Sequence, residues 1–557
     1  MIRVRRLIAI FKLVGLAELI MRGASLVSLV GVAAGLKLWP QPSSVTIGSV
    51  SDRVTFRIES GGGYANFAIK SVGQPSTLLT DAISRSYTTL RASGDFAVLG
   101  TLATLDVNVT SSDTTLRFGV DECYNLTLGL ESKYDHHAKL TARTVYGALR
   151  GLETFLQLAD NYGPNDANGL LSVPRSFSIS DTPRFSWRGL MIDTGRHFYP
   201  VSAIEHIIDT MAMSKLNVMH WHATDDQSFA VESKLYPRLT SEGAFKDRRG
   251  RPRQYTQQNV TDLVAYAAAR GVIVVPEFDM PAHAAAWGAG YPQFMVQGAC
   301  CSPAPFMHGD TLNPTIDGTY DFLDALLSEL GALFATSPFL HLGGDEVPVT
   351  SWTLNTTVAA WMKAHDLDVG STQALFVNRV KDGPKLTALQ KDLVYWEEIF
   401  ENVGAKALPK GTLIQAWKSN AMPAVVAAGH RTTNSFKWYL NHGCNNFGDG
   451  MWGDFYENDP LHFVPNASAA EQALVVGGET TMWAECVDHV IFDSIVWPRA
   501  AAAAEKLWSP RAATQNATTE VGERLAEHRC RLVARGVRAA PINDGGDDPR
   551  GLNAGCM

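Results

Sequence analysis

The stretch RGLMIDTGRHFYPVSAIEHIIDTMAMSKLNVMHW, residues 188–221, contains two short apolar runs with a longer segment between them. RGLMID and LNVMHW are mostly apolar without alternation, which is typical of strands that are buried on both faces. Between them, AIEHIIDTMAMSK (203–215) repeats its apolar residues at the 3.6-residue spacing of a helix. The stretch therefore predicts a strand, a helix and a second strand, which is the repeating unit of a parallel α/β sheet.

The same alternation continues along the chain, with helical segments such as VTDLVAYAAARG (260–271) between short strands. Eight β-then-α units predict the α/β class and a (β/α)₈ TIM barrel. An open, doubly wound sheet is the alternative. The eight expected strands are RGLMID (188–193), LNVMHW (216–221), VIVVPE (272–277), FLHLGG (339–344), LVYW (393–396), TLIQAW (412–417), RTTNSF (431–436) and VVGGETTMW (475–483).

Residues before this region have a different pattern, which predicts a separate, smaller α+β domain. VTFRI (54–58), FAVLG (96–100) and TTLRFGV (114–120) look like strands, and ARTVYGALRGLETFLQLAD (142–160) has helical spacing. SDTPRFSW (180–187) supplies the turn residues of a boundary. We therefore expect the α+β domain at 38–180, the barrel at 181–535 and a tail at 536–557.

The composition is that of a globular protein, and the N-terminus is typical of an exported chain. The chain has 557 residues, of which 46% are hydrophobic and 19% charged, with a net charge of −8. No basic stripe follows the first few residues, so nucleic acid is not an expected partner. Residues 1–37 combine a basic start with apolar runs and predict a signal peptide, with Met21 a second candidate start. An uncleaved signal anchor is the alternative, and only then would a membrane be a partner.

Six Asn-X-Ser/Thr sites agree with a chain that enters the secretory pathway and is secreted or held in a lysosome-like or vacuole-like compartment. Their asparagines are Asn108, Asn125, Asn259, Asn355, Asn466 and Asn516. The seven cysteines suit one to three disulfides and have no zinc-type spacing. We expect no metal and no cofactor.

Each expected strand is followed by polar or aromatic residues that are costly to bury for packing alone. Taken singly, each has an ordinary structural explanation as a core aromatic, a surface charge or a hydrogen-bonded histidine. Because the carboxyl ends of barrel strands meet at one end, eight such positions converge on one site. In strand order they are Arg196, Asp225 with Asp226, His283, Asp345 with Glu346, Trp396, Trp417, Tyr439, and Trp483 with Glu485.

Aromatic rings around carboxylates indicate a sugar site, because a ring face packs on the apolar face of a pyranose. Arg196 and Glu485 can hold hydroxyls by charge-assisted hydrogen bonds. HLGGDEVP (341–348) raises a difficulty, because most glycosidases use two carboxyl groups that face each other across the sugar. Asp345 and Glu346 are adjacent, and neighbours in an extended chain point to opposite sides.

These segments also carry a resemblance. RGLMIDTGRH, LNVMHWHATDDQSF, EFDMPAH, HLGGDEV, IQAW, WYLN and GGETTMWAE occur in the order found in family 20 β-N-acetylhexosaminidases, the group that includes the lysosomal hexosaminidases. The match runs from about Leu38 to Trp508. It implies an exo-acting enzyme that removes terminal N-acetylglucosamine or N-acetylgalactosamine from glycans, glycoconjugates or chitooligosaccharides. The family also allows a homodimer.

The resemblance implies that the nucleophile is the 2-acetamido group of the substrate, with net retention. Glu346 would be the general acid and base, and Asp345 would bind the acetamido N–H. Tyr439 would bind the acetamido carbonyl, and Asp225 with His283 would support Glu346. The implied substrate-binding residues are Arg196, Trp396, Trp417, Asn441, Trp483 and Glu485.

Some positions depart from the family pattern. Ala282 stands where relatives commonly have glycine, and Ser351 where lysosomal relatives have a disulfide cysteine, which leaves Cys300 and Cys301 without that partner. His442 stands where one lysosomal subunit has an arginine linked to sialylated glycolipid, so ganglioside activity is not expected. The family pattern also implies a bond between Cys530 and Cys556.

Two other functions are alternatives. An endo-acting chitinase-type hydrolase would have a spaced acidic motif on the fourth strand, and HLGGDE lacks that spacing. A catalytically silent sugar-binding protein would be expected to lack the acid, whereas Glu346 is present. The paired His220 and His222 of HWH fit hydrogen bonding at a strand end better than zinc binding.

Overall fold

The computed structural model describes residues 37–49, 51–56, 67–92, 102–129, 136–159, 171–297, 311–409, 411–418, 421–542 and 556. The expected signal, apart from residue 37, the strand FAVLG, Cys300 and Cys301 lie outside these residues. Among the helices that are described, none is both long and apolar enough to cross a bilayer.

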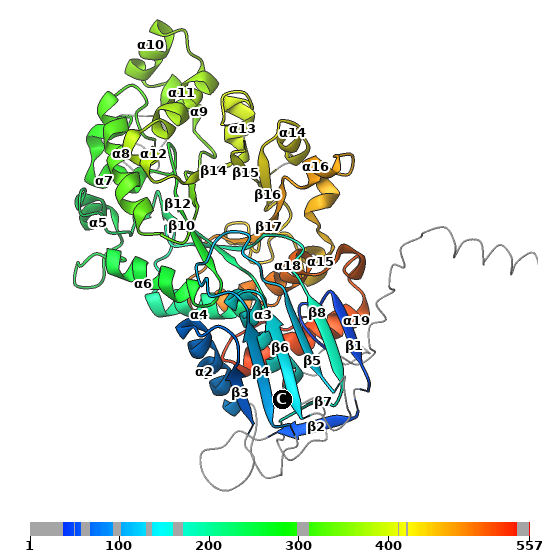
Figure 1. The fold of residues 1–557 in the computed structure, drawn as a ribbon. Helices are drawn as coiled ribbons and strands as arrows, with labels where there is room; N and C mark the ends of the chain where they lie inside the picture. Colours follow the sequence, from blue (N-terminus) through cyan, green and yellow to red (C-terminus); the bar gives the residue numbers. More distant parts are fainter. Residues whose placement is uncertain are drawn as a thin grey trace, which may run out of the picture. The chain divides into compact units, whose positions relative to one another are not determined.

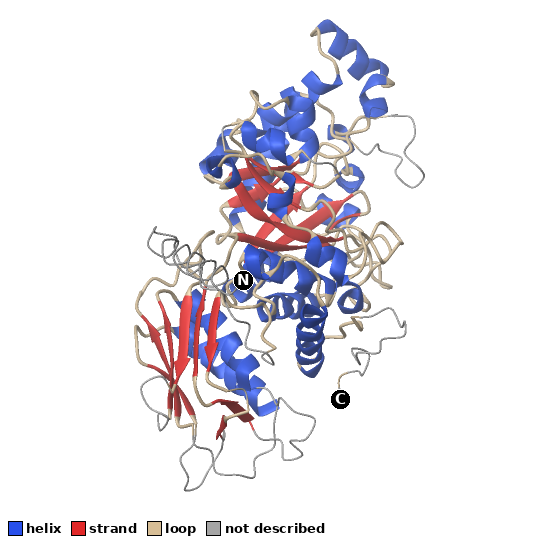
Figure 2. Ribbon diagram, turned by 90° about the vertical axis from the view of Figure 1, so that its right-hand side faces the viewer, coloured by secondary structure: helices blue, strands red, loops and turns tan. Residues whose placement is uncertain are grey.

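An α+β domain precedes the barrel, as the sequence predicts. Its six-stranded mixed sheet has the order β1-β8-β5-β6-β4-β3, and a two-stranded pair, β2–β7, lies beside it. Helices α2 (Thr77–Ala92) and α3 (Val145–Ala159) cover one face of the sheet (Figure 2). The strands are β1 (Ser44–Ile47), β2 (Arg53–Phe56), β3 (Ala68–Ser71), β4 (Thr104–Val109), β5 (Tyr124–Leu128), β6 (His137–Ala142), β7 (Leu171–Pro174) and β8 (Phe177–Asp181).

One expected strand of this domain is wrong. Residues 114–120 (TTLRFGV) form no strand, although β-branched and apolar residues occur there at strand-like spacing. Instead, the ring of Phe118 packs against Trp187 and Phe339 at ring-centre distances of 6.0 and 4.9 Å. Both partners are the first residues of barrel strands. Phe118 is therefore buried by a contact with the barrel and not by strand pairing, which local propensity alone would predict.

Eight parallel strands close into a barrel in the order β10-β12-β13-β14-β15-β16-β17-β9, with β9 pairing back to β10 (Figure 1). This confirms the barrel and excludes the open sheet. The short β11 (Ser228–Phe229) adds to β10 in antiparallel fashion. The barrel strands are β9 (Trp187–Asp193), β10 (Val218–Asp225), β12 (Ile273–Phe278), β13 (Phe339–His341), β14 (Asp392–Trp396), β15 (Leu413–Ala416), β16 (Arg431–Asn434) and β17 (Val475–Met482). The domain boundaries at 180/181 and 535/536 stay a prediction.

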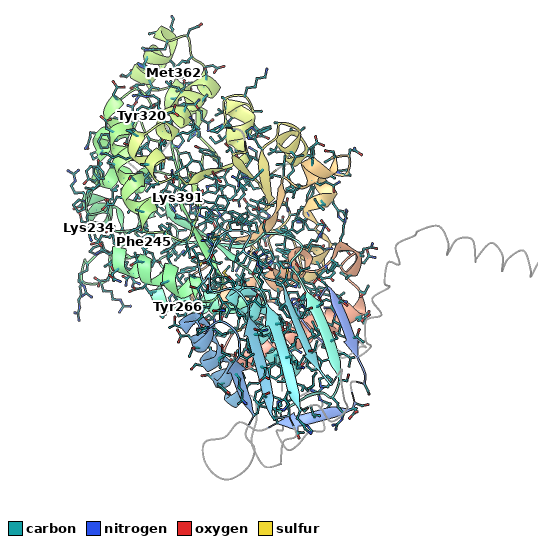
Figure 3. The ribbon with its side chains drawn as sticks, viewed as in Figure 1. Lys234, Phe245, Tyr266, Tyr320, Met362 and Lys391 are labelled. Atoms are coloured by element: carbon teal, nitrogen blue, oxygen red, sulfur yellow. A yellow bond between two sulfur atoms is a disulfide. The ribbon has the colours of Figure 1, made fainter. Side chains whose placement is uncertain are left out.

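Helices follow the strands and surround the barrel. Between neighbouring helices, Arg379 lies over the ring of Tyr320 at 3.7 Å (Tyr320 is labelled in Figure 3). The helices between strands are α4 (Val201–Met213), α5 (Arg238–Gly243), α6 (Gln257–Ala268), α7 (Ala285–Gly290), α8 (Asp317–Ala332), α9 (Val349–Thr353), α10 (Thr356–Ala364), α11 (Val369–Lys381), α12 (Pro384–Ala388), α13 (Glu397–Val403), α14 (Met422–Ala427), α15 (Trp452–Glu457) and α16 (Ala469–Gln472). The last strand is followed by α17 (Phe492–Val496), α18 (Arg499–Trp508) and α19 (Thr519–Ala534).

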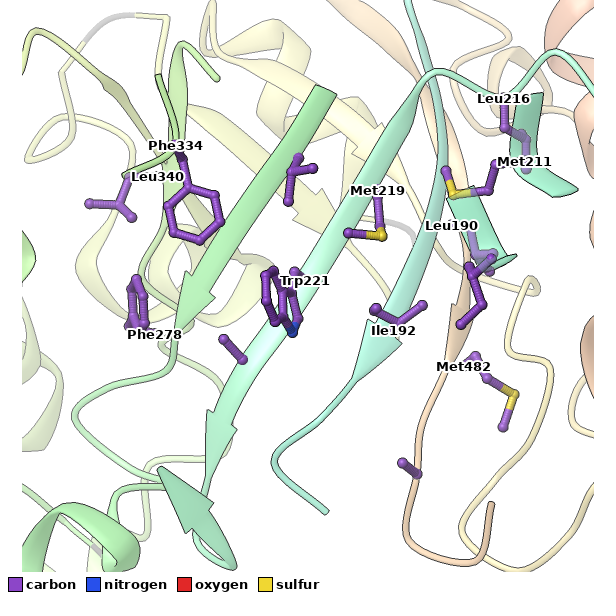
Figure 4. Close-up of a cluster of buried hydrophobic side chains, with 14 of the residues drawn as sticks. Leu190, Ile192, Met211, Leu216, Met219, Trp221, Phe278, Phe334, Leu340 and Met482 are labelled. Atoms are coloured by element: carbon purple, nitrogen blue, oxygen red, sulfur yellow. The ribbon is translucent and has the colours of Figure 1, made fainter. Parts of the chain in front are cut away.

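Alternation along the strands separates an apolar outer layer from a charged interior. Met219 and Trp221 of β10 point toward the helices with Ile192 and Phe278 of neighbouring strands (Figure 4). Successive residues of a strand point to opposite faces. The side chains at the alternate positions therefore point into the barrel, and on β10 these include His220 and His222.

Buried ion pairs join the α+β domain to the barrel. Glu122 binds Arg150 of α3 at 2.8 Å and Arg188 of β9 at 2.6 Å. Lys215, which precedes β10, binds Asp181 at 2.9 Å. Each charge has a partner, as burial requires.

The tail is tied back to the last helix. Cys530 of α19 forms a disulfide with Cys556, which confirms the pairing implied by the family resemblance. A second disulfide, Cys444–Cys486, joins the loops after β16 and β17. Cysteine pairs of this kind are typical of proteins that fold in an oxidising compartment such as the secretory pathway.

Candidate active site

A pocket of about 190 Å³ opens at the carboxyl ends of the barrel strands. Ten of the eleven residues expected at the site line it, and Asp225, the eleventh, lies directly behind them. Asp226 does not line the pocket; its Oδ1 accepts a hydrogen bond from the N–H of Ala285. The lining residues are Arg196, His283, Asp345, Glu346, Trp396, Trp417, Tyr439, Asn441, His442, Gly443, Trp483 and Glu485.

The turn after β13 places its two carboxylates through an unusual backbone. Gly343, Gly344 and Glu346 have φ angles of 64°, 100° and 47°, in the left-handed region that disfavours side chains. A Cβ atom on Gly343 would lie 1.6 Å from Oδ1 of Asp279. The glycines are therefore required at these positions, and Glu346 is held in a conformation that is common at functional sites.

The loop after β12 presents His283, whose φ angle is 52°. Ala282, where relatives commonly have glycine, has no positive φ, so alanine is tolerated there. The imidazole lies among carboxylates: Nδ1 is 3.6 Å from Asp225, and Nε2 is 3.5 Å from Glu346 and 3.8 Å from Asp345. His283 therefore connects Asp225 with both carboxylates of the turn.

Asp225 contacts three cationic side chains at once, those of Arg196, His222 and His283. Its Oδ2 is 2.8 Å from Arg196 and accepts a hydrogen bond from Nε2 of His222 at 2.8 Å. Burial alone would raise its pKa, but Arg196, then His283 and His222, hold the pKa of Asp225 well below its usual value. Asp225 therefore stays ionised and orients Arg196 and His283.

Burial and charge set the protonation of the three groups beside the turn. Burial opposes a charged imidazole, yet Asp225, Glu346 and Asp345 raise the pKa of His283 well above its usual value. The hydrogen bond and charge of His283 lower the pKa of Glu346, although burial acts the other way. Burial raises the pKa of Asp345 to about 6, against the charge of His283. In the free pocket His283 is therefore an imidazolium, and the raised pKa leaves Asp345 partly protonated at about pH 6.

Aromatic rings form the walls. Trp396 and Trp417 meet edge to face at 6.4 Å, and Trp417 stacks on Tyr439 at 5.9 Å. Trp483 closes the ring at 6.1 Å from Trp396 and 6.4 Å from Tyr439. Burial raises the pKa of Tyr439 well above its usual value. The hydroxyl therefore keeps its proton and can donate it to a ligand.

Two polar atoms of the site are buried without a hydrogen-bond partner among the residues that the structure describes. They are Oδ1 of Asp345 and Nε of Arg196. Leaving such groups unpaired costs about 1–3 kcal/mol each. Since both residues line the pocket, a ligand with an N–H donor and oxygen acceptors would satisfy them.

Asn441 has a structural use that the sequence did not suggest. Its amide bonds the backbone of Trp483 in both directions, through Nδ2 at 2.9 Å and Oδ1 at 3.0 Å. Its Oδ1 can still accept a second hydrogen bond. Asn441 thus ties the loop after β16 to the loop after β17, as does the disulfide Cys444–Cys486.

Several supporting residues were missed in the sequence. Asp193 accepts the backbone N–H groups of Arg196 at 3.1 Å and Ala484 at 3.0 Å, and Glu398 accepts the indole N–H of Trp417 at 2.9 Å. Glu277 accepts the indole N–H of Trp396 at 2.7 Å. The sequence marks these three residues only weakly. Each is a single acidic residue near a strand end, and other acidic residues in the same positions look equally suitable for a supporting role.

Some groups in the barrel interior have the side chains of a metal site. His220, Glu277 and His341 bring one ligand atom each within 4.8 Å of one another. Glu277, however, already contacts His222 at 2.6 Å and Trp396 at 2.7 Å, so its oxygens are committed to protein groups. We assign no metal role to this cluster.

A larger crevice of about 870 Å³ lies beside α2, α3, α4 and α19. Its described lining contains arginines such as Arg85 and Arg270 and no aromatic side chain. The grouping of aromatic rings with carboxylates therefore makes the smaller pocket the candidate active site.

Comparisons with known proteins identify the family of the chain. Residues 185–511 match the family described as glycosyl hydrolase family 20, catalytic domain, and residues 38–158 match the family described as beta-acetyl hexosaminidase like. The chain is 36% identical over 527 residues to beta-hexosaminidase 3 of Arabidopsis thaliana, covering 92% of each. It is 38% identical over 436 residues to the beta-hexosaminidase alpha subunit of Rattus norvegicus, covering 76% of this chain and 77% of the relative.

A solved structure shares the architecture. The chitobiase of Flavobacterium johnsoniae is similar with a TM-score of 0.75 and 30% identity, over 90% of this chain and 73% of that one. The fold, the pocket and these matches together lead to one assignment. The chain belongs to glycosyl hydrolase family 20 and is a β-N-acetylhexosaminidase, a glycoside hydrolase that removes terminal N-acetylhexosamine residues.

Proposed function

We propose that this enzyme hydrolyses its substrate by a retaining mechanism in which the sugar's own 2-acetamido group is the nucleophile. The observation that carries the proposal is the unpartnered, buried Oδ1 of Asp345 at the pocket wall. An acetamido N–H is a donor that would satisfy it. Because the acetamido carbonyl is tethered to the sugar, it reaches the anomeric carbon at high effective concentration.

Asp345 and Glu346 do not need to act as an opposed pair in this scheme. Both carboxylates lie near one atom, Nε2 of His283, at 3.8 and 3.5 Å. The imidazole of His283 therefore lies beside the carboxylate oxygens of both Asp345 and Glu346. This arrangement supports a nucleophile supplied by the substrate rather than by a second carboxylate of the enzyme.

Glu346 is proposed as the general acid that protonates the leaving oxygen and then as the base that activates water. Its side chain is 59% exposed in the free pocket, so a bound sugar removes water from it. Desolvation disfavours the charged carboxylate and raises its pKa, which moves Glu346 toward the protonated form that an acid requires. His283 keeps it oriented.

Asp345 and Tyr439 are proposed to act on the two ends of the acetamido group. Asp345 accepts the N–H and stabilises the positive charge that develops as the carbonyl attacks. Burial raises the pKa of Tyr439 well above its usual value, so its hydroxyl keeps a proton that it can donate to the acetamido oxygen. Together they fix the acetamido group in the direction of attack.

The remaining pocket residues are proposed to bind the sugar ring. Trp396, Trp417 and Trp483 enclose it, and Arg196 and Glu485 bind its outer hydroxyls. Asn441 offers Oδ1 to a hydroxyl. Asp225 holds Arg196 and His283 in place through the contacts at 2.8 and 3.6 Å.

A cavity of about 190 Å³ is small beside the roughly 300–1,000 Å³ of pockets for drug-sized ligands. Its size supports one terminal sugar and hence exo cleavage. We expect a chitotetraose labelled at its reducing end to give labelled trimer first, together with N-acetylglucosamine that is initially the β anomer. Chromatography and proton NMR of early time points measure both. Labelled dimer ahead of trimer, or an initial α anomer, would contradict the proposal.

We also propose that the chain matures in the secretory pathway and is secreted or held in a lysosome-like or vacuole-like compartment. The disulfides Cys444–Cys486 and Cys530–Cys556 support an oxidising compartment. A homodimer stays a prediction.

A further inference from the structure

Glu277, on β12, is a buried carboxylate that the proposed reaction does not use. Its Oε1 accepts the indole N–H of Trp396 at 2.7 Å and lies 3.2 Å from Nδ1 of His341. Its Oε2 lies 2.6 Å from Nδ1 of His222 and 2.9 Å from Nε2 of His220. Each oxygen therefore takes part in one hydrogen bond, Oε1 with Trp396 and Oε2 with His222, while His341 and His220 lie close beside them.

The histidines on either side must carry positive charge. His222 places Nδ1 on Glu277 and Nε2 on Asp225, at 2.6 and 2.8 Å. An ionised carboxylate only accepts, so both ring nitrogens of His222 must carry hydrogen. His220 lies between Glu277 and Glu479, at 2.9 and 2.8 Å. Burial lowers the pKa of His220, but the charges of Glu479 and Glu277 raise it to about 9.

The result is a row of alternating charges through the barrel interior. From the centre of the barrel to the pocket it runs Glu479, His220, Glu277, His222, Asp225 and then Arg196 with His283. Burial opposes every one of these charges, but each has opposite charges on its neighbours. Removing one member would leave the buried charge of its neighbour without a partner, which is destabilising.

Glu277 does not line the pocket, but each of its oxygens is connected to residues that do, Oε1 directly and Oε2 through His222 and Asp225. Oε1 fixes the indole plane of Trp396. Oε2 holds His222, which holds Asp225, which in turn binds Arg196 at 2.8 Å and contacts His283 at 3.6 Å. We propose that Glu277 is a positioning residue for the hydrolysis, which orients Trp396 on one side of the pocket and the Asp225–Arg196–His283 group on the other.

A comparison within the chain separates this role from ordinary structural support. Glu122 is also a buried carboxylate with two cationic partners, Arg150 and Arg188, at 2.8 and 2.6 Å. Neither of these partners lines the pocket. Substituting Glu122 therefore measures what loss of a buried ion pair does to the protein without disturbing the site.

The pKa of Asp345 gives a second readout, because it depends on the charges of Glu277 and His222 and would not change through a loss of stability alone. The negative charge of Glu277 raises the pKa of Asp345, and the positive charge of His222 lowers it. Removing either charge must shift the titration of Asp345, in opposite directions. The charged and titratable groups that face Asp345 are His283, Glu277, Glu398, His222, Asp279 and Tyr439.

The test compares Glu277→Gln, His222→Gln and Glu122→Gln in the full chain, each checked for folding by circular dichroism. Kinetics with a dinitrophenyl β-N-acetylglucosaminide, whose leaving group needs no proton from Glu346, are measured from pH 4 to 9. We expect Glu277→Gln to lower kcat/KM about 100-fold, because small misplacements of site groups have effects of that size. We expect Glu122→Gln to change the kcat/KM of the folded protein little, whatever it does to Tm.

The acid limb of the pH profile, where kcat/KM falls as Asp345 takes up a proton, gives the second comparison. It should move about 0.5–1 pH unit to lower pH in Glu277→Gln and to higher pH in His222→Gln. If Glu277→Gln does not fold, the shift of the acid limb in His222→Gln decides whether the charged row is coupled to Asp345. A limb that does not move, or a loss of kcat/KM no greater than that of Glu122→Gln, would overturn the proposal.

This inference rests on the proposed function only through the role given to Asp345. A wild-type profile without an acid limb near pH 6 would refute that role. The rate comparison between Glu277→Gln and Glu122→Gln would still decide whether Glu277 positions the site.

Discussion

The Glu346→Gln variant is expected to lose about 10³- to 10⁴-fold in kcat/KM on chitobiose, since general acid catalysis contributes up to that much. The loss should be far smaller on a dinitrophenyl glycoside, because dinitrophenolate leaves without a proton. The amide keeps the size of Glu346 but cannot donate a proton as an acid. Steady-state kinetics on the two substrates measure the difference.

The second half of the reaction supplies a further check on this variant. If Glu346 also activates water, the variant should accumulate the cyclic intermediate on the dinitrophenyl substrate, and added azide should raise kcat by attacking it. Glu523→Gln, the same change on the exposed face of α19, should leave both substrates unaffected. An equal loss of kcat/KM on both leaving groups would argue against the acid role.

The Asp345→Asn variant is expected to lose about 10²- to 10³-fold in kcat on acetamido sugars, as is typical when one stabiliser of transition-state charge is removed. Asparagine keeps the shape of the side chain but not the charge that balances the developing oxazolinium. Aryl glucosides, which have a hydroxyl instead of the acetamido group, should be slowed much less. Rates on a matched pair of aryl glycosides measure this selectivity.

The pH profile of the same variant tests the electrostatics. Burial raises the pKa of Asp345 to about 6, and the reaction needs the ionised form. In the wild type, kcat/KM on a dinitrophenyl β-N-acetylglucosaminide, whose leaving group needs no proton from Glu346, should therefore fall as the pH drops through about 6. The variant has no carboxylate at this position and should lack that limb. Equal slowing of both sugars, with the limb retained, would refute the role of Asp345.

The barrel and its lining residues were predictable because each strand is marked locally. RGLMID and HLGGDE are apolar runs that end in polar residues, and strand ends converge in any barrel of this order. The strand expected at TTLRFGV was wrong because Phe118 packs on Trp187 and Phe339, which come from distant segments of the chain. Local spacing carries no information about such contacts.

The charged interior was not predictable. His220 and His222 are hydrogen-bonded, as expected, but the sequence did not show that their partners would be Glu479 and Glu277 of other barrel strands. Their protonation depends on which carboxylates of other strands face them, and that follows only from the closed sheet. The pairing of Cys444 with Cys486 is similar, because cysteine spacing does not determine connectivity.

The central claim is that the carbonyl oxygen of the substrate attacks the anomeric carbon while Asp345 and Tyr439 hold it. Its most direct test is kcat/KM on aryl glycosides whose acetamido group carries zero, one, two or three fluorine atoms. Fluorine withdraws electrons from the carbonyl oxygen, so kcat/KM should fall steeply with each atom added. Rates that stay level across the series would contradict the claim, because they would mean that the bond to the anomeric carbon is made by another group.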